Sequence, residues 1–436
     1  MILPIVLAAC AIGSVSAQCG TLAVPENRAL PGGPQVTLGI AVVPATDRST
    51  RRADPVFWIA GGPGGSALED LKWLVPSFPD VLRHRDLVFV DQRGVGRSSP
   101  LSCQIATSSA DPAELVRACL GVVGADVTHY RTVDAMDDLD AVRQGLGYDK
   151  IDVFGGSYGA TAAQVYMRRH AETVRAVVLD GATLLDVPVL ERWSSSGQRA
   201  LDLLHRRCHA DRACAKAFPR WYERFPALLA KVRRAPVRVG GATFDAAEVA
   251  EGVHELTATM QGAAAVPFLL ARAEAGTYAP LARALALVPT TPGRVMPLAI
   301  MCTEPWAIQR PAAVRADARG TYLSYVDPLT ADGMARACGA WPAVDTTAED
   351  WSRVRSDVPT LVLVGGSDPK DPPRNVAGVT QAMPNAAVVT VPGGAHGVSF
   401  VGCLPRVLDD FLEAGTGRGL DTSCVSLTPY PAFRLR

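Results

Sequence analysis

The 436-residue sequence predicts an α/β fold, in which helices flank a mostly parallel β-sheet and a mainly helical insertion interrupts that sheet. Short apolar runs that end in glycine-rich loops alternate with helical patterns on both sides of the insertion, as is typical of a parallel sheet. Between residues 183 and 355 the chain is rich in alanine and arginine and has few strand-like runs. We therefore expect two core regions, 18–182 and 356–436, with a helical cap at 183–355 between them.

Residues 1–17 are apolar and end in Val15-Ser16-Ala17, small residues that fit the cleavage site of an export signal. No Lys or Arg precedes the apolar run, so the positive region of such a signal is missing, and a buried N-terminal strand is the alternative. Cys10 follows a stretch that resembles the lipobox of bacterial lipoproteins, which makes it a candidate lipid anchor. We expect a secreted or periplasmic protein, or a lipoprotein, without a membrane span.

The charges balance at 43 basic and 43 acidic residues, so no net field attracts nucleic acid or an anionic membrane, and we exclude nucleic acid as a partner. Ten cysteines favour an oxidising compartment. Cys19 would lack a partner if Cys10 left with a signal peptide. Local spacing suggests four other pairs, Cys103–Cys119, Cys208–Cys214, Cys302–Cys338 and Cys403–Cys424.

A metal site is the alternative interpretation of one cysteine pair, because two histidines lie beside it. The group consists of His205, Cys208, His209 and Cys214. Its spacing matches no standard zinc pattern, and a disulfide hairpin is simpler in an exported protein. We therefore expect neither a metal nor another cofactor.

The first predicted strands lead to a glycine loop. Residues 36–45 alternate loosely, as in an antiparallel strand, and the apolar run 55–59 predicts a buried strand. That run ends in Ala-Gly-Gly-Pro-Gly-Gly at residues 60–65. A glycine loop lets a backbone N–H approach a developing oxyanion, and we expect Gly62 to be the donor.

Further strands and a helix follow in order. The run 87–90 predicts a strand, and the loop after it carries Asp91 and Arg93, which we expect to form a buried structural pair. Residues 132–146 have an acidic first turn and the apolar spacing of a helix packed against a sheet. Apolar runs at 174–179, 360–364 and 387–391 predict the remaining strands.

The sequence from 150 to 161 predicts a nucleophile elbow. An apolar strand runs into Gly-Gly-Ser-Tyr-Gly, residues 155–159, and then into a helix of small residues. The glycines two before and two after Ser157 are needed because a side chain there would collide with a neighbouring strand or helix. In such an elbow the N–H of the following residue, Tyr158, is the second oxyanion donor.

A base and an acid follow at the places where this chemistry needs them. His396 lies in a glycine-flanked loop after the last predicted strand, and Asp368 follows the strand before it. Asp371 is the second candidate for the acid, but its position between Lys370 and Pro372 suggests that it faces water. The chain order Ser157, Asp368, His396 is that of α/β-hydrolases. We expect His396 to deprotonate Ser157 while Asp368 holds the imidazole tautomer.

Five motifs together resemble the prolyl iminopeptidase and tripeptidyl aminopeptidase family of α/β-hydrolases, over the range 19–424. They are residues 61–64, 91–98, 155–159, 366–369 and 394–400. The C-terminal stretch from His396 to Cys424 is similar to the tail of the tripeptidyl branch. Ala60 where prolyl iminopeptidases often carry His, and Tyr158 where they often carry Trp, also favour that branch.

The resemblance implies a serine exopeptidase that acts on peptides with a free N-terminus, with the same triad and oxyanion roles and with the helical insertion as a cap. Glu304 is our candidate for binding the substrate's amino group, and a surface glutamate is the alternative interpretation. The expected product is an N-terminal proline or a di- or tripeptide. An esterase or lipase with the same triad is the alternative function, and a catalytically silent binding protein on this fold is the alternative from another class.

Overall fold

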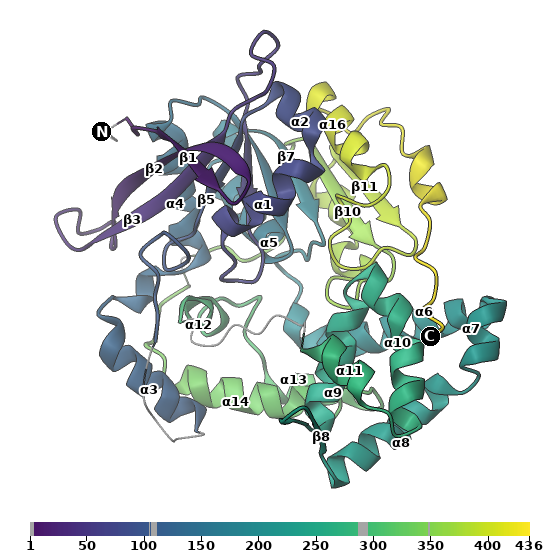
Figure 1. Ribbon diagram of the computed structural model, residues 1–436. Coiled ribbons are helices and arrows are strands. Elements are labelled where there is room, and N and C mark those ends of the chain that lie inside the picture. The colour runs from purple at the N-terminus through teal and green to yellow at the C-terminus, as the bar shows by residue number, and fades with distance from the viewer. Residues whose placement is uncertain (1–3, 104, 106–110, 287–294, 348) are drawn as a thin grey trace.

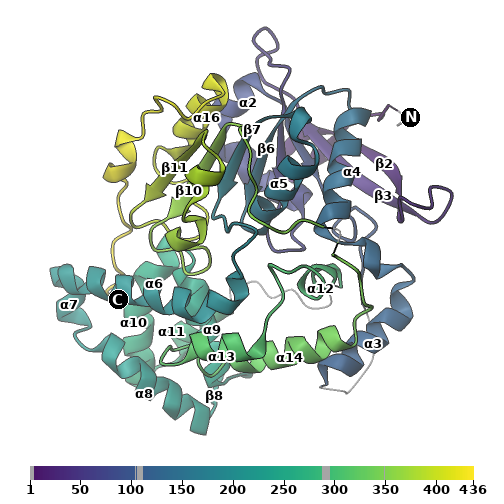
Figure 2. The same ribbon diagram turned by 180° about the vertical axis from the view of Figure 1, so that it is seen from behind.

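The computed structural model describes residues 4–103, 105, 111–286, 295–347 and 349–436. Figures 1 and 2 show a twisted sheet with helices on both faces, and a mostly helical region below the ends of its strands. Within the described residues one sheet has nine strands, in the spatial order β1 (Ala8–Ile12), β2 (Val15–Pro25), β3 (Gln35–Val43), β5 (Leu87–Val90), β4 (Val56–Ile59), β6 (Ile151–Gly156), β7 (Val174–Asp180), β10 (Thr360–Gly365) and β11 (Ala386–Val391). From β5 to β11 all neighbours are parallel, whereas β1, β2 and β3 are antiparallel additions.

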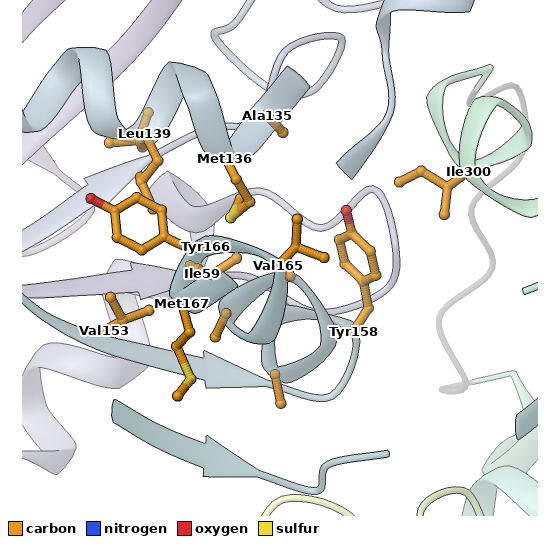
Figure 3. Close-up of a cluster of buried hydrophobic side chains, with 14 of the residues drawn as sticks. Ile59, Ala135, Met136, Leu139, Val153, Tyr158, Val165, Tyr166, Met167 and Ile300 are labelled. Carbon is orange, nitrogen blue, oxygen red and sulfur yellow. The ribbon is translucent and has the colours of Figure 1, made fainter. Parts of the chain in front are cut away.

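Alternate residues of the central strands face two separate hydrophobic cores, as expected of a parallel sheet covered on both faces. In β4, Phe57 packs in the core beneath α4 (Thr132–Gly145) and α5 (Tyr158–Arg169), while Trp58 packs in the core on the opposite face. Figure 3 shows side chains of α4 lying over those of α5 and of the strands, with Tyr158 at the edge of this core nearest Ile300. The opposite face is covered by α1 (Ala67–Ser77), α2 (Pro79–His84) and α16 (Leu404–Ala414).

Between β7 and β10, where the sequence predicts a helical insertion at 183–355, the chain forms a mostly helical region with a core of its own. Helix α3 (Pro112–Val123), which precedes it in sequence, packs against its last helix (Figure 1). The elements of this cap are η3 (Val189–Arg192), α6 (Trp193–Ala210), α7 (Arg212–Ala217), α8 (Trp221–Arg234), the hairpin β8 (Val237–Val239) and β9 (Ala242–Phe244), α9 (Ala246–Thr257), α10 (Met260–Glu274), α11 (Ala279–Leu285), α12 (Met296–Met301), α13 (Pro311–Ala318) and α14 (Asp327–Gly339).

Short elements complete the core. They are η1 (Val127–His129), η2 (Ala171–Thr173), η4 (Pro373–Val376), α15 (Val379–Ala382) and η5 (Ser423–Leu427). None of the helices in the described ranges is both long and apolar enough to cross a bilayer.

The segment expected to be an export signal is part of the sheet in this structure. Strand β1 pairs with β2 in an antiparallel hairpin, and β2 pairs with β3. Cys10 forms a disulfide with Cys19, so in the unprocessed chain Cys19 has a partner. The same bond leaves Cys10 without the free thiol that lipid attachment would require.

The four disulfides predicted from local spacing are confirmed, and with Cys10–Cys19 they pair all ten cysteines. The bond between Cys208 and Cys214 joins α6 to α7 and uses both sulfurs of the alternative metal group. Cys302–Cys338 joins the end of α12 to α14 across 36 residues, and closing a loop of this length stabilises the native state by restricting the unfolded chain.

The expected pairing of Asp91 with Arg93 is wrong, although both side chains are buried. Arg93 makes a bidentate ion pair with Asp138 of α4, at 2.6 and 2.7 Å. Asp91 accepts hydrogen bonds from Ser66 Oγ and from the N–H groups of Leu68 and Arg97. Each of the two side chains therefore has partners of its own instead of the other side chain.

Candidate active site

Ser157 occupies the turn between β6 and α5, as predicted. Its backbone has φ 56° and ψ −125°, a conformation that is strained for a residue with a side chain. The flanking glycines allow the turn to be this tight. A Cβ on Gly155 would lie 2.1 Å from the carbonyl oxygen of Gly159, and a Cβ on Gly159 would lie 2.0 Å from that of Ile59.

Asp368 and His396 form a hydrogen-bonded pair next to this turn. Asp368 Oδ2 lies 2.9 Å from His396 Nδ1, and Asp368 Oδ1 accepts the backbone N–H groups of Lys370 and Asp371 at 2.8 and 2.9 Å. The N–H of His396 donates to the carbonyl of Ala258 in the cap, at 3.1 Å. Backbone hydrogen bonds thus hold both loops in place. Because Asp368 contacts Nδ1, Nε2 is the ring nitrogen that Asp368 does not engage.

The electrostatics of the pair favour a charged imidazole. Burial opposes the charge, but Asp368, through its charge and its hydrogen bond, and then Asp371 outweigh it and raise the pKa of His396 to about 9. Burial also works against ionisation of Asp368, but the adjacent imidazole and the two backbone donors hold its pKa below the usual value. The ionised Asp368 therefore stabilises the imidazolium that forms when His396 takes a proton, and it raises the pH above which the neutral ring can act as a base.

Asp371 does not face water, contrary to the expectation from its sequence neighbours. Its side chain is 11% exposed, and its Oδ2 lies 3.6 Å from His396 Nδ1. Burial, together with the charge of Asp368, raises the pKa of Asp371 to about 6. The ligand atoms of Asp368, Asp371 and His396 lie within 4.8 Å of one another, but the hydrogen bond between Asp368 and Nδ1 fits an acid–base pair and not a metal ligand.

One cavity of about 420 Å³ brings four of the six predicted site residues together. Ser157, His396 and both oxyanion candidates, Gly62 and Tyr158, line it. Gly62 has φ 120°, a conformation open to glycine, and Tyr158 begins α5, where the first backbone N–H groups have no acceptor within the helix. The cavity therefore brings the serine and the histidine together with the two residues whose N–H groups are the candidate oxyanion donors.

Glu304 does not line this cavity. It is fully buried behind its wall, where its carboxylate accepts hydrogen bonds from Thr132 N (2.6 Å), Thr132 Oγ1 (2.8 Å) and Trp306 Nε1 (2.7 Å). The Trp306 ring is stacked on Tyr158 at 5.9 Å between centroids, and both aromatic side chains line the cavity. The structure therefore assigns Glu304 to supporting the wall and not to contacting substrate.

A second cavity, of about 200 Å³, shares Leu190, Trp193 and Met301 with the first one, so it lies on the other side of these side chains. Its polar lining includes three carboxylates of the cap that the sequence analysis missed, Glu251, Glu255 and Asp327. Glu251 and Glu255 are four residues apart on α9, and this spacing on one helix face was the available signal. Asp327 comes from α14, and nothing in its local sequence marks it.

Charge in this second cavity is only partly neutralised. Glu255 pairs with Lys370 at 2.8 Å, and Asp327 accepts a hydrogen bond from Ser194 Oγ. Burial raises the pKa of Asp327 to about 6, and burial with the nearby charge of Glu255 raises the pKa of Glu251. No ion pair involves Glu251 or Asp327 among the residues that the structure describes.

The strained serine turn, the Asp–His pair and the shared cavity define a serine hydrolase built on a mostly parallel α/β sheet. Residues 54–402 match the sequence profile of the family described as alpha/beta hydrolase fold. The match covers most of the chain, and the protein belongs to this family. The fold class predicted from the sequence is thereby confirmed.

Sequence comparison finds similarity to proteases, aminopeptidases and esterases. The chain is 30% identical to the tripeptidyl aminopeptidase of Streptomyces coelicolor over 186 residues, which are 37% of this chain and 34% of that protein. It is 26% identical to the serine protease Hip1 of Mycobacterium tuberculosis, covering 92% of this chain and 86% of the relative. It is 29% identical to carboxylesterase B of the same organism, over 49% of this chain and 46% of the relative.

These relatives confirm the resemblance to tripeptidyl aminopeptidases that the motifs predicted. The matched region spans only about a third of the tripeptidyl aminopeptidases. Among solved structures, the proline iminopeptidase of Mycobacterium smegmatis aligns with a TM-score of 0.40 and 15% identity, over 91% of this chain and 98% of that one.

Proposed function

We propose that this protein is a serine aminopeptidase that removes an N-terminal residue or a short di- or tripeptide from peptides. Ser157 Oγ attacks the scissile carbonyl carbon as His396 takes the serine proton, and His396 then protonates the leaving amine. Asp368 holds the ring so that Nε2 accepts this proton. The N–H groups of Gly62 and Tyr158 stabilise the oxyanion, and water hydrolyses the acyl-enzyme in a second round of the same steps.

The acidic second cavity is the observation that carries the aminopeptidase assignment. An aminopeptidase must bind a free α-ammonium group, and carboxylates in a partly buried pocket stabilise such a cation. Lys370 neutralises Glu255, which leaves Glu251 and Asp327 for the substrate. A substrate whose acyl group lies at Ser157 and whose amino end passes Trp193 would reach these side chains.

A carboxylesterase is the second candidate, because the wall of the catalytic cavity is largely apolar. Val189, Leu190, Trp193, Met301 and Trp306 would accommodate an aliphatic or aromatic acyl group. The similarity to carboxylesterase B supports the same alternative. Acyl-transfer chemistry is common to both functions, so only the substrate can distinguish them.

The test is hydrolysis of free and N-blocked aminoacyl, dipeptidyl and tripeptidyl nitroanilides beside nitrophenyl butyrate. Ser157→Ala should lose several orders of magnitude in turnover on every substrate. Glu251→Gln should lower kcat/KM for free peptides by about tenfold or more, because a charged hydrogen-bond partner is lost, and should leave the ester unaffected. Glu274→Gln is the matched control, since Glu274 lies on the cap surface in an exposed pair with Arg224.

Each outcome selects one function. Preference for unblocked peptides, lost in Ser157→Ala and reduced in Glu251→Gln, supports the aminopeptidase, and the length of the product gives the branch. Turnover of the ester alone would replace this proposal with the carboxylesterase. If neither substrate is turned over and a fluorophosphonate does not label Ser157, the protein is a binding protein on this fold.

We also propose that the protein works outside the cytoplasm. Five disulfides that pair every cysteine support an oxidising compartment. Mass spectrometry of the unreduced protein from its native host would test this. Disulfide-linked peptides would support the proposal, and free thiols at all these cysteines would overturn it. Cleavage after Ala17 or a lipid on Cys10 would also support export, but would show that the Cys10–Cys19 bond is absent from the mature protein.

A further inference from the structure

Two carboxylates, not one, face the imidazole of His396. Asp368 Oδ2 is 2.9 Å from Nδ1, and Asp371 Oδ2 is 3.6 Å from the same nitrogen. Both side chains come from the loop after β10, three residues apart. A Ser–His–Asp triad requires only one of them, so the second carboxylate needs its own explanation.

Asp371 is held in place by bonds that direct one oxygen to the histidine. Its Oδ1 accepts a hydrogen bond from Thr183 Oγ1, and Thr183 Oγ1 in turn accepts one from Asn375 Nδ2 at 2.8 Å. Its backbone N–H donates to Asp368 Oδ1 at 2.9 Å. With Oδ1 and the backbone fixed in this way, Oδ2 is the oxygen left to face His396 Nδ1.

We propose that Asp371 is a positioning residue for His396, a second carboxylate whose charge lies beside the Nδ1–H that Asp368 accepts and which sets the pH range in which the imidazole can act as a base. This inference rests on the triad of the proposed function, but it does not depend on the substrate. When Ser157 Oγ gives its proton to Nε2, the ring becomes a cation with a proton on each nitrogen. The negative charge of Asp371 stabilises that cation alongside Asp368.

The direction of the effect follows from the charges around His396. Removing a negative charge at 3.6 Å favours the neutral ring, so the pKa of His396 falls and the base becomes available at lower pH. The charged and titratable groups near the ring are Asp368, Lys370 and Asp371 of the acid loop, His254 of α9 and Asp180 of β7. Glu255 of α9 pairs with Lys370, and Arg199 of α6 lies near Asp368, so these two act on the ring through their neighbours. All of them except Asp371 are unchanged in an Asp371→Asn variant.

The experiment measures the rate at which a fluorophosphonate labels Ser157 as a function of pH, which needs no knowledge of the substrate. In Asp371→Asn the acidic limb of this profile should shift to lower pH by about one unit. A neighbouring charge shifts a pKa by about one to three units, and this is the lower end of that range. The asparagine can still accept the Thr183 hydrogen bond, and Asp371→Thr is a second neutral variant if the first does not fold. Asp332→Asn is the matched control, because Asp332 lies in an exposed pair with Arg315, and its profile should match the wild type.

If Asp371 has a purely structural role, its replacement would lower the labelling rate or the melting temperature without shifting the acidic limb of the pH profile. An unshifted acidic limb in a folded neutral variant overturns the proposal. A wrong aminopeptidase assignment would give a different result. The fluorophosphonate would still label Ser157, but the protein would not turn over free peptides. If Ser157 is not labelled at all, an NMR titration of the His396 ring decides. A lower ring pKa in Asp371→Asn supports the proposal, and an unchanged one overturns it.

Discussion

Replacing Glu304 by glutamine tests how a buried carboxylate supports the wall of the catalytic cavity. Glu304 is fully buried and accepts three hydrogen bonds, two from Thr132 at the start of α4 and one from the Trp306 indole. Burial dominates over these donors and raises the pKa of Glu304 from 4.5 to about 7. Glutamine has nearly the same shape but cannot ionise.

The raised pKa makes the stability contributed by Glu304 depend on pH. Because the folded-state pKa lies above the unfolded-state value, this contribution is complete below about pH 4.5 and is lost as the pH rises through about 7. A shift of about 2.5 units corresponds to about 3 kcal/mol over the whole range, and to about 2.5 kcal/mol between pH 5 and pH 8. In Glu304→Gln this dependence is absent.

The measurement is urea unfolding of the wild type and of Glu304→Gln at both pH values. The difference in unfolding free energy, wild type minus variant, should fall by about 2.5 kcal/mol from the lower pH to the higher one. Other titrating groups cancel in this difference. Glu172→Gln is the control, because Glu172 is exposed, and its difference should stay constant. If the difference for Glu304→Gln is the same at both pH values, Glu304 is ionised throughout and our reasoning about its burial is wrong.

Two further predictions concern packing around the site. Arg93→Met should lower the free energy of unfolding by about 3 kcal/mol, because the buried Asp138 keeps only the partly exposed Arg28 as a charged partner. A loss below about 1 kcal/mol in urea unfolding would contradict this. Gly159→Ala should prevent the native elbow from forming, since its Cβ would lie 2.0 Å from the carbonyl oxygen of Ile59, and it should yield no labelled Ser157. Gly121→Ala on α3 is the control, because nothing lies within 4 Å of the added Cβ. It should stabilise the protein by up to about 1 kcal/mol in urea unfolding. If the two alanine variants behave alike, the steric argument is wrong.

The strands and the elbow could be predicted because their constraints are local. The apolar run of β6 and the glycines around Ser157 lie within a few residues of one another, and the steric limits on the turn act over the same distance. His396 and Asp368 were found for a related reason, since the carboxyl ends of neighbouring parallel strands meet at one edge of a sheet. Four disulfides followed from short spacings in the same way.

Interactions between distant segments were decided by tertiary structure alone. Arg93 pairs with Asp138, 45 residues away, and Glu304 binds Thr132 across 172 residues, so neither partner could be found from neighbouring residues. Asp371 has a charged residue and a proline beside it in sequence, yet packing against Thr183 buries it against His396.

The sequence by itself therefore determined the parallel strands of the sheet, the serine turn and the order of Ser157, Asp368 and His396, because short-range sterics and strand patterning specify them. The tertiary structure decided which buried carboxylates face the histidine, support the cavity wall or line the second cavity. The physical reason is that desolvation and charge pairing depend on what surrounds a side chain in space, and most of those neighbours are remote in the chain.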